Sequence, residues 1–292
     1  MLDVAADSEP DAESANEVAS IRDVPRRGID PLLAVGLSIV VGVLLLGLLA
    51  PFLTPHDPLE QEVRNRFAPP SGEHWLGTDR LGRDVFTRLL YAARIDIPLA
   101  IAATLLAALI GTVLGAVAGY AGRRTDAVVM RLADVVQAFP MYVFLVALVF
   151  VLGPGAPSFL VAAACISWVG YARLARADVL RLASADFVVA AKASGLGHRR
   201  VLIGHLMPNV MPQIYAYIAS DAVIALVALS SLSFLQLGVQ PPTPEWGQMV
   251  ADGVDRIRAE WWLSTAPGMA IVIVGVGLSL MAYGMERQAA RR

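Results

Sequence analysis

Long apolar segments alternate with shorter polar stretches along this chain. Six of the segments are long and apolar enough to cross a bilayer, which takes roughly 20 residues of helix. They run approximately over Leu32–Leu53, Ile97–Tyr120, Val135–Leu152, Phe159–Ala175, Val210–Leu235 and Ser264–Met285. We therefore expect an all-α membrane protein with six transmembrane helices. The composition agrees, because 57% of the residues are hydrophobic and only 16% are charged.

The same pattern divides the chain into regions. Residues 1–30 carry eight acidic residues and three arginines with few large apolar side chains, which predicts a disordered acidic tail. We expect residues 31–53 to form the first transmembrane helix and residues 54–94 an extracytoplasmic loop. Residues 95–285 are expected to form a five-helix core, interrupted by a loop at 186–209, and residues 286–292 a second tail.

Basic residues indicate how the spans are oriented. If both termini and the 186–209 loop are cytoplasmic, the inner side holds 15 basic residues and the outer loops hold eight. This excess on the inner side satisfies the positive-inside rule, so we expect both termini in the cytoplasm. The first outer loop contains six arginines and seven acidic residues. Such near balance predicts a folded loop with internal ion pairs.

The loop at 186–209 reads DFVVAAKASGLGHRRVLIGHLMPN. Its first part favours a helix up to Ala193, and Gly195 and Gly197 permit a sharp turn after it. A second short helix is expected from His198 to Leu206, ending before Pro208. One face of that helix carries Val201, Leu202, His205 and Leu206, and the other carries Arg199 and Arg200. An apolar stripe beside a basic edge predicts a docking surface for a soluble partner.

The outer loop closes with the string LGTDRLGRD. Its two glycines permit tight turns, and its polar side chains can accept hydrogen bonds from nearby backbone N–H groups. We expect a helix to start after the last aspartate and to continue into the second span. The residues that define the string are Leu76, Gly77, Thr78, Asp79, Gly82, Arg83 and Asp84.

A third string, LSFLQLGVQPPTPEWG, follows the fifth apolar segment from Leu232 to Gly247. Prolines at 241, 242 and 244 cannot continue a helix, so the fifth span must end before them. Trp246, Trp261 and Trp262 flank the returning loop and suit the membrane interface.

These three strings resemble one family. The 186–209 loop resembles the EAA loop of ABC importer permeases, with Val189 where a Glu is usual and Met207 where a Leu is usual. The LGTDRLGRD string resembles the C-type permease subunit of dipeptide, oligopeptide and nickel importers. The third string differs from the family's LSFLGLGVQPP at Gln236, where a Gly is usual.

The resemblance implies a type I ABC importer permease fold in a bacterial-type plasma membrane. The implied partners are a homologous permease subunit, two ATP-binding subunits, an extracytoplasmic substrate-binding protein and the lipid bilayer, with no nucleic acid. ATP and Mg would be bound by the ATPase subunits, and no cofactor by this chain. The residues implied to couple to the ATPase are Ala190, Ala191, Gly195, Gly197, Arg199, Arg200, Val201, Leu202, His205 and Pro208.

No sequence pattern in the chain indicates catalysis. There is no G-x-x-x-x-G-K-[ST] phosphate loop, so any ATPase must act in trans, and there is no H-E-x-x-H or G-x-S-x-G motif. We therefore expect neither catalytic nor metal-binding residues and a subunit that is not an enzyme by itself.

Two features within the spans have structural or functional readings. Gly111, Gly115 and Gly119 recur every four residues, which predicts a helix face that packs closely against another helix. Asp221 lies inside the fifth span, where a charge is costly unless it faces water or a partner. It either faces the substrate pathway or pairs with a polar group on the partner permease, and the sequence leaves both readings open.

The sequence thus predicts a permease subunit of an ATP-driven importer for dipeptides or oligopeptides. Two alternatives stay open. The same architecture could import nickel or another small solute, because these relatives share the permease motifs. A membrane scaffold or sensor could also have kept the fold and lost transport.

Overall fold

The computed structural model describes residues 29–290, so most of the predicted acidic tail lies outside the described residues. Within this range the regular structure is helical, apart from one isolated bridge between Thr78 and Asp84. The helices are α2 (Pro31–Leu48), α3 (Ala50–Leu53), η1 (Val63–Asn65), α4 (Val85–Ala121), α5 (Arg123–Gln137), α6 (Met141–Leu152), α7 (Ala156–Leu182), α8 (Asp186–Ala193), α9 (His198–Val201), η2 (Leu202–Leu206), α10 (Met207–Phe234), α11 (Trp246–Val254) and α12 (Trp262–Ala290).

The described chain has five helices that are long and apolar enough to cross a membrane. A sixth span results if α5 and α6, which meet at an angle of 91°, are taken together. The predicted all-α membrane protein is therefore confirmed, but the predicted third span over 135–152 is not one helix. It breaks between Gln137 and Met141 because Pro140 disfavours helical backbone at the residue before it and lacks the N–H that would continue the helix.

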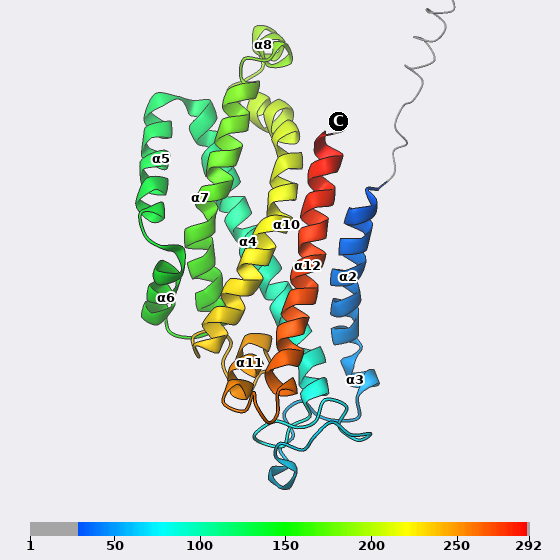
Figure 1. Cartoon of the computed structure of the whole chain (residues 1–292). Coiled ribbons are helices and arrows are strands. Elements are labelled where there is room, and N and C mark those ends of the chain that lie inside the picture. Colours follow the sequence, from blue (N-terminus) through cyan, green and yellow to red (C-terminus); the bar gives the residue numbers. More distant parts are fainter. Residues whose placement is uncertain (1–28, 291–292) are drawn as a thin grey trace, which may run out of the picture.

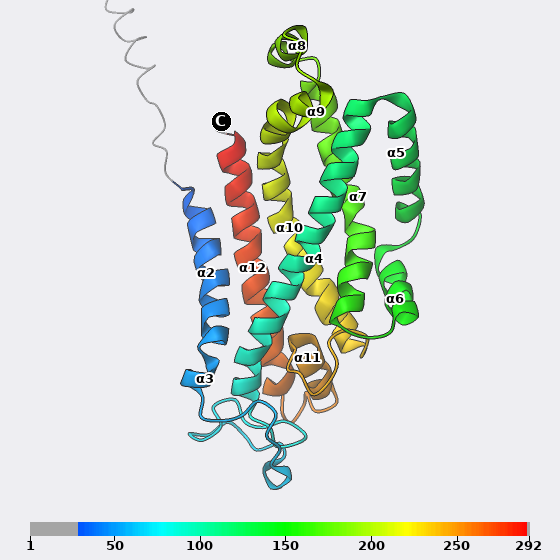
Figure 2. The ribbon, with the colours of Figure 1, turned by 180° about the vertical axis from the view of Figure 1, so that it is seen from behind.

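The long helices stand side by side as a bundle (Figures 1 and 2). α4, α7, α10 and α12 form its centre, α2 lies beside α12 at one edge, and α5 and α6 lie beside α7 at the other edge. The loop around α8, the start of α2 and the end of α12 share one end of the bundle (Figure 1). The outer loop and α11 lie at the opposite end. The two candidate functional regions are thus separated by the full length of the spans.

The closest packing in the bundle joins α4 to α7. A methyl group added to Gly111 or Gly115 would collide with the carbonyl oxygens of Trp168 and Ala172 on α7. A methyl on Gly119 would lie 2.9 Å from another α7 carbonyl oxygen. The three glycines therefore lie on one face of α4, where the two helix backbones approach more closely than larger residues would permit.

The helix that leads out of the 186–209 loop does not end at Pro208. α9, η2 and α10 form one continuous apolar helix from His198 to Phe234. η2 has π-helical hydrogen bonding just before Pro208, so the regular hydrogen-bond ladder is already interrupted where Pro208 lacks an N–H. The expected end before Pro208 is wrong for this reason. The end of α10 at Phe234, ahead of the three prolines, is as predicted.

Candidate functional site

The 186–209 loop folds into two short helices joined by a tight turn. α8 ends at Ala193, and Gly195 adopts a φ of 79° in the left-handed region that glycine tolerates best. The Leu196 N–H then donates a 3.2 Å hydrogen bond to the Ala191 carbonyl and closes the turn. After this turn, Gly197 is the residue that precedes α9.

Apolar side chains fix this loop to the bundle. Val188, Val201 and Leu206 are fully buried and belong to a core cluster that includes Val210 and Ile214 of α10. The loop is also linked to the end of α4, because the Tyr120 hydroxyl lies 3.1 Å from Nδ1 of His198. The loop is therefore packed against both α10 and the end of α4.

The outward side of the loop is basic and open. The side chains of His198, Arg199 and Arg200 are exposed, and Leu202 and His205 are partly covered. Together with Gly197, Ile203 and Gly204, the three exposed residues line a shallow groove of about 690 Å³. Ala190, Gly197 and Pro208 are also exposed, whereas Ala191 is buried against the core. Val189, the residue in place of the usual Glu, is 53% exposed.

At the opposite end, the LGTDRLGRD string forms a compact turn around Asp79. One carboxylate oxygen of Asp79 accepts hydrogen bonds from the backbone N–H groups of Leu81 and Arg83, at 2.8 and 3.0 Å. The other oxygen accepts a 2.6 Å hydrogen bond from Nε of Arg83. Asp84 caps α4 by accepting a 2.7 Å hydrogen bond from the Thr87 N–H. The predicted ion pairs within the loop and the predicted helix start after Asp84 are both present.

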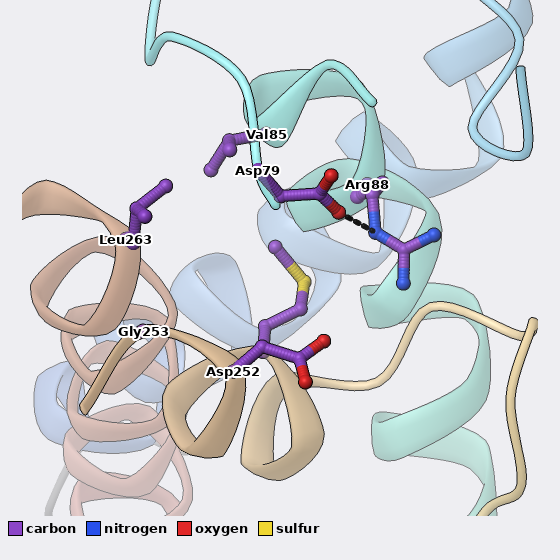
Figure 3. Close-up of a pocket in the computed structure, with 7 residues that line it drawn as sticks. Asp79, Val85, Arg88, Asp252, Gly253 and Leu263 are labelled. Carbon is purple, nitrogen blue, oxygen red and sulfur yellow. Dashed lines mark ion pairs between the residues drawn. The ribbon is translucent and has the colours of Figure 1, made fainter. Parts of the chain in front are cut away.

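Ion pairs extend from this turn to α11. Asp252 of α11 lies 3.3 Å from Arg80 and 3.8 Å from Arg83. Arg88 of α4 lies 3.8 Å from Asp79 and donates a 2.9 Å hydrogen bond to the Pro58 carbonyl. Figure 3 shows the carboxylates of Asp79 and Asp252 on the same side of Arg88, around a small cavity of about 20 Å³. Burial raises the pKa of Asp252, and the neighbouring arginines act in the opposite direction.

Glu245 caps α11, and Trp246 attaches α11 to α4. Glu245 is fully buried and caps α11, since its carboxylate accepts hydrogen bonds from the Gly247 and Gln248 N–H groups at 2.9 and 2.7 Å. Burial raises the pKa of Glu245 to about 7, against these two hydrogen bonds. The Trp246 indole donates a 3.0 Å hydrogen bond to the Leu89 carbonyl. Trp246 is only 1% exposed, so its predicted place at the membrane interface is wrong.

Sequence reasoning missed several members of this network. Asp252 and Arg88 carry no local motif, and nothing in the sequence indicates that α11 folds back onto the start of α4. Glu245 was missed because Glu is not one of the residues that usually cap a helix N-terminus. Asp96 could have been singled out, because it is an acidic residue directly before a long apolar segment.

Asp221 forms its contact within the chain. It is 4% exposed, and its Oδ2 accepts a 3.0 Å hydrogen bond from the Tyr171 hydroxyl of α7. The ring of Tyr217 packs edge-on against Tyr171, with the ring centroids 4.7 Å apart. The side chain also borders a narrow cavity between α4, α6, α7 and α10. The partner is therefore a tyrosine of the same subunit, a possibility that the sequence did not suggest.

The comparisons with known proteins cover nearly the whole chain. Residues 111–292 match the family described as binding-protein-dependent transport system inner membrane component. Residues 30–70 match the N-terminal TM domain of oligopeptide transport permease C.

Individual relatives extend this match. The dipeptide transport system permease protein DppC of Alkalihalophilus pseudofirmus is 37% identical over 255 residues, covering 87% of this chain and 84% of the relative. The oligopeptide transport system permease protein OppC of Bacillus subtilis is 34% identical over 289 residues, covering 98% and 95%. The nickel transport system permease protein NikC of Escherichia coli is 36% identical over 255 residues, covering 87% and 90%.

The helical bundle with a two-helix loop at one end is therefore consistent with the match to these permease proteins. The chain belongs to the family of inner-membrane permease components of binding-protein-dependent ABC importers.

Proposed function

We propose that this chain is the C-type permease subunit of an ATP-driven importer of dipeptides or oligopeptides. The observation that carries the proposal is the exposed 186–209 loop, fixed to the core by Val188 and Val201 and continuous with α10. A docking element that is rigidly joined to a membrane span can pass a movement of a bound ATPase to the pathway. ATP and Mg would be held by the ATPase subunits, and this chain would supply no catalytic group.

The two ends of the bundle suggest how the complex is arranged. We assign the end with the basic loop to the cytoplasm, where two ATP-binding subunits would each dock a permease. The exposed Arg199 and Arg200 offer charge to such a partner in place of the Glu that Val189 replaces. The opposite end, with its ion-paired loop and α11, would meet the substrate-binding protein. A homologous permease would complete the pathway.

The names of the relatives support peptides as cargo. Dipeptide, di/tripeptide and oligopeptide permeases of several bacteria match this chain at 34–37% identity. The nickel permease of Escherichia coli, at 36%, keeps a nickel or small-solute importer as the second candidate. The permease sequence does not separate them, because the binding protein largely selects the cargo in this family.

Asp221 has two proposed roles that the contact with Tyr171 helps to distinguish. We favour a structural role in which the pair holds α10 against α7, because both groups are buried within the subunit. The alternative is a pathway group that binds the amino end of a peptide. If Asp221→Asn leaves uptake unchanged in a normally assembled complex, the pathway role is excluded. A large loss of uptake with normal assembly would contradict the structural role.

The test of the function is ATP hydrolysis by the complete complex in lipid. The rate is compared without and with the binding protein loaded from a mixed peptide pool. Stimulation by peptide-loaded binding protein supports the proposal, and fractionating the pool then identifies the cargo. Stimulation by nickel or another solute alone would keep the architecture and change the cargo. A chain that assembles in the membrane without affecting ATP turnover would be a scaffold or sensor.

A further inference from the structure

Two histidines and an aspartate from separate segments meet in the outer loop. His56 follows α3, His74 lies near the middle of the loop, and Asp84 precedes α4. One donor atom from each lies within 4.8 Å of the donor atoms of the other two. The imidazole rings of His56 and His74 are 4.8 Å apart between centroids. The proposed transport function assigns no role to the contacts among these three residues.

We propose that His56, His74 and Asp84 bind one divalent transition-metal ion. Two imidazoles and one carboxylate are ligands that Zn²⁺ accepts readily, and they favour it over Ca²⁺ and Mg²⁺, which prefer oxygen ligands alone. The position of the site in the outer loop also distinguishes it from a cargo site within the bundle. The inference does not depend on which solute the importer carries.

Neighbouring groups already hold the proposed ligands in orientation. Oδ1 of Asp84 accepts the Thr87 N–H at 2.7 Å, and Oδ2 is hydrogen-bonded to Nδ1 of His74 at 2.9 Å, so a metal ion bound by these two atoms would replace the proton between them. Nε2 of His56 lies 3.0 Å from the Glu73 carbonyl oxygen. A proton on that nitrogen would donate to the carbonyl and leave the other ring nitrogen for a metal. Backbone carbonyls commonly orient metal-binding histidines in this way.

The spacing needs only a small closure around an ion. With bonds of about 2.0–2.1 Å, donor atoms about 2.9 Å apart subtend roughly 90° at zinc, and tetrahedral ligands lie about 3.4 Å apart. His74 and Asp84, 8% and 5% exposed, are held in place, so His56 is the residue that must move inward. His56 is half-buried and lines an open cavity of about 210 Å³ with Glu73 and Trp75. The cavity can admit water as a fourth ligand.

A metal here would connect three parts of the outer loop. It would tie the segment after the first span to the middle of the loop and to the first turn of α4. Many residues between 54 and 75 are exposed. The bound ion would therefore order the loop on the side of the protein that faces the binding protein.

Zinc binding by the full chain in lipid discs tests the proposal. The protein is stripped with a chelator, dialysed against buffered free Zn²⁺, and its metal content is measured; the absorption of bound Co²⁺ then reports the ligand geometry. We expect one Zn²⁺ per chain and thermal stabilisation by the ion. His56→Asn and Asp84→Asn should each weaken binding by at least about tenfold. Asn also caps helices well, so Asp84→Asn keeps the start of α4.

His198→Asn is the matched control, because His198 is exposed and begins α9, at the opposite end of the bundle (Figure 2). It should leave zinc binding unchanged. The proposal is overturned if the wild-type chain binds no zinc, or if His56→Asn and Asp84→Asn bind it as the wild type does. Loss of zinc in the control alone would also overturn it. None of these results depends on peptide-stimulated ATP hydrolysis, so the two proposals can fail separately.

Discussion

The carboxylate of Asp96 in α4 accepts a 3.0 Å hydrogen bond from the backbone N–H of Trp246, the first residue of α11. Both residues are buried, although 150 positions separate them in the chain. This contact and the indole bond to Leu89 hold α11 against α4. The stability of this end of the bundle should therefore depend on a few side chains.

Trp246→Ala should strongly destabilise the protein. The indole is 1% exposed and donates to the Leu89 carbonyl, so its removal leaves a cavity and an unpaired acceptor. We expect a loss of about 3–5 kcal/mol in the free energy of unfolding. Thermal unfolding of the purified chain in lipid measures it. Trp261→Ala is the control, because Trp261 is 58% exposed and its loss should change stability by less than about 0.5 kcal/mol.

Glu245 should make stability depend on pH. Its pKa of about 7 exceeds the ordinary value of 4.5, so between these values the folded chain holds a proton that the unfolded chain releases. The free energy of unfolding should therefore fall as pH rises from about 4.5 through about 7, by up to about 3 kcal/mol. Asp252 adds to the fall in the same direction, since burial raises its pKa as well.

Unfolding of Glu245→Gln across this pH range checks the assignment. Its stability should vary less with pH than that of the wild type, whatever its absolute value. Glu60→Gln, at an exposed position, should keep the wild-type slope. Equal slopes in wild type and Glu245→Gln would mean that Glu245 does not titrate in this range.

Gly115→Ala should weaken the packing of α4 on α7. The added methyl would meet the Ala172 carbonyl, a backbone atom that cannot rotate away. We expect a loss of about 1–3 kcal/mol, as for other overpacked positions. Gly42→Ala makes the same change in α2, where nothing lies within 4 Å of the added methyl. It should be neutral or gain up to about 1 kcal/mol, and similar effects at both sites would contradict the close approach.

Gln236→Gly should stabilise the protein. Gln236 adopts a φ of 64°, in the left-handed region, and it stands where the family usually has Gly. Relief of this backbone conformation should gain about 1 kcal/mol in the free energy of unfolding. Gln213→Gly is the control, because Gln213 is exposed inside α10, where Gly disfavours the helix. This change should lower the free energy of unfolding by about 1 kcal/mol. A loss of stability in Gln236→Gly would show that its side chain has another role.

Reversing both charges on the loop should weaken ATPase attachment. Arg199→Glu with Arg200→Glu places two acids on the rim of the groove without touching the buried Val201. We expect a reduced yield of ATPase subunits in a pull-down on the permease. The wild type should recover more ATPase at low salt than at high salt, because salt screens exposed charges. Arg123→Glu with Arg124→Glu makes the same charge change on exposed residues at the start of α5. A normal yield from the loop variant would contradict the proposed docking role.

The sequence predicted those parts of the fold that follow from local patterns. Apolar length located the spans, and Asp84 ahead of a helical pattern located the start of α4. The contact of Arg83 with Asp252 could not be predicted, because it joins segments distant in sequence with no pairing signal. The burial of Trp246 was missed because an interfacial tryptophan and a core tryptophan look alike beside a proline-rich turn.

The proposed metal ligands illustrate the same limit. Positions 56, 74 and 84 follow no ligand spacing that identifies a site, so only the folded loop brings them together. The contact between Tyr171 and Asp221 could not be expected either, because an apolar segment has too few polar residues for its periodicity to show which face each one occupies.

The continuity of the helix from His198 to Phe234 has a mechanical consequence. A straight helix of 37 residues would be about 55 Å long. A movement of its first turns, which lie in the basic loop, can therefore displace its far end. Its irregular points within the described chain are the π turn of η2, Pro208 and Pro212, all near the loop. A movement of the loop can bend the helix at these points, or it can shift the whole helix and so reach the opposite end of the bundle. If an ATPase docks on the loop as proposed, the stiffness of this stretch sets how much of the ATPase movement reaches that end.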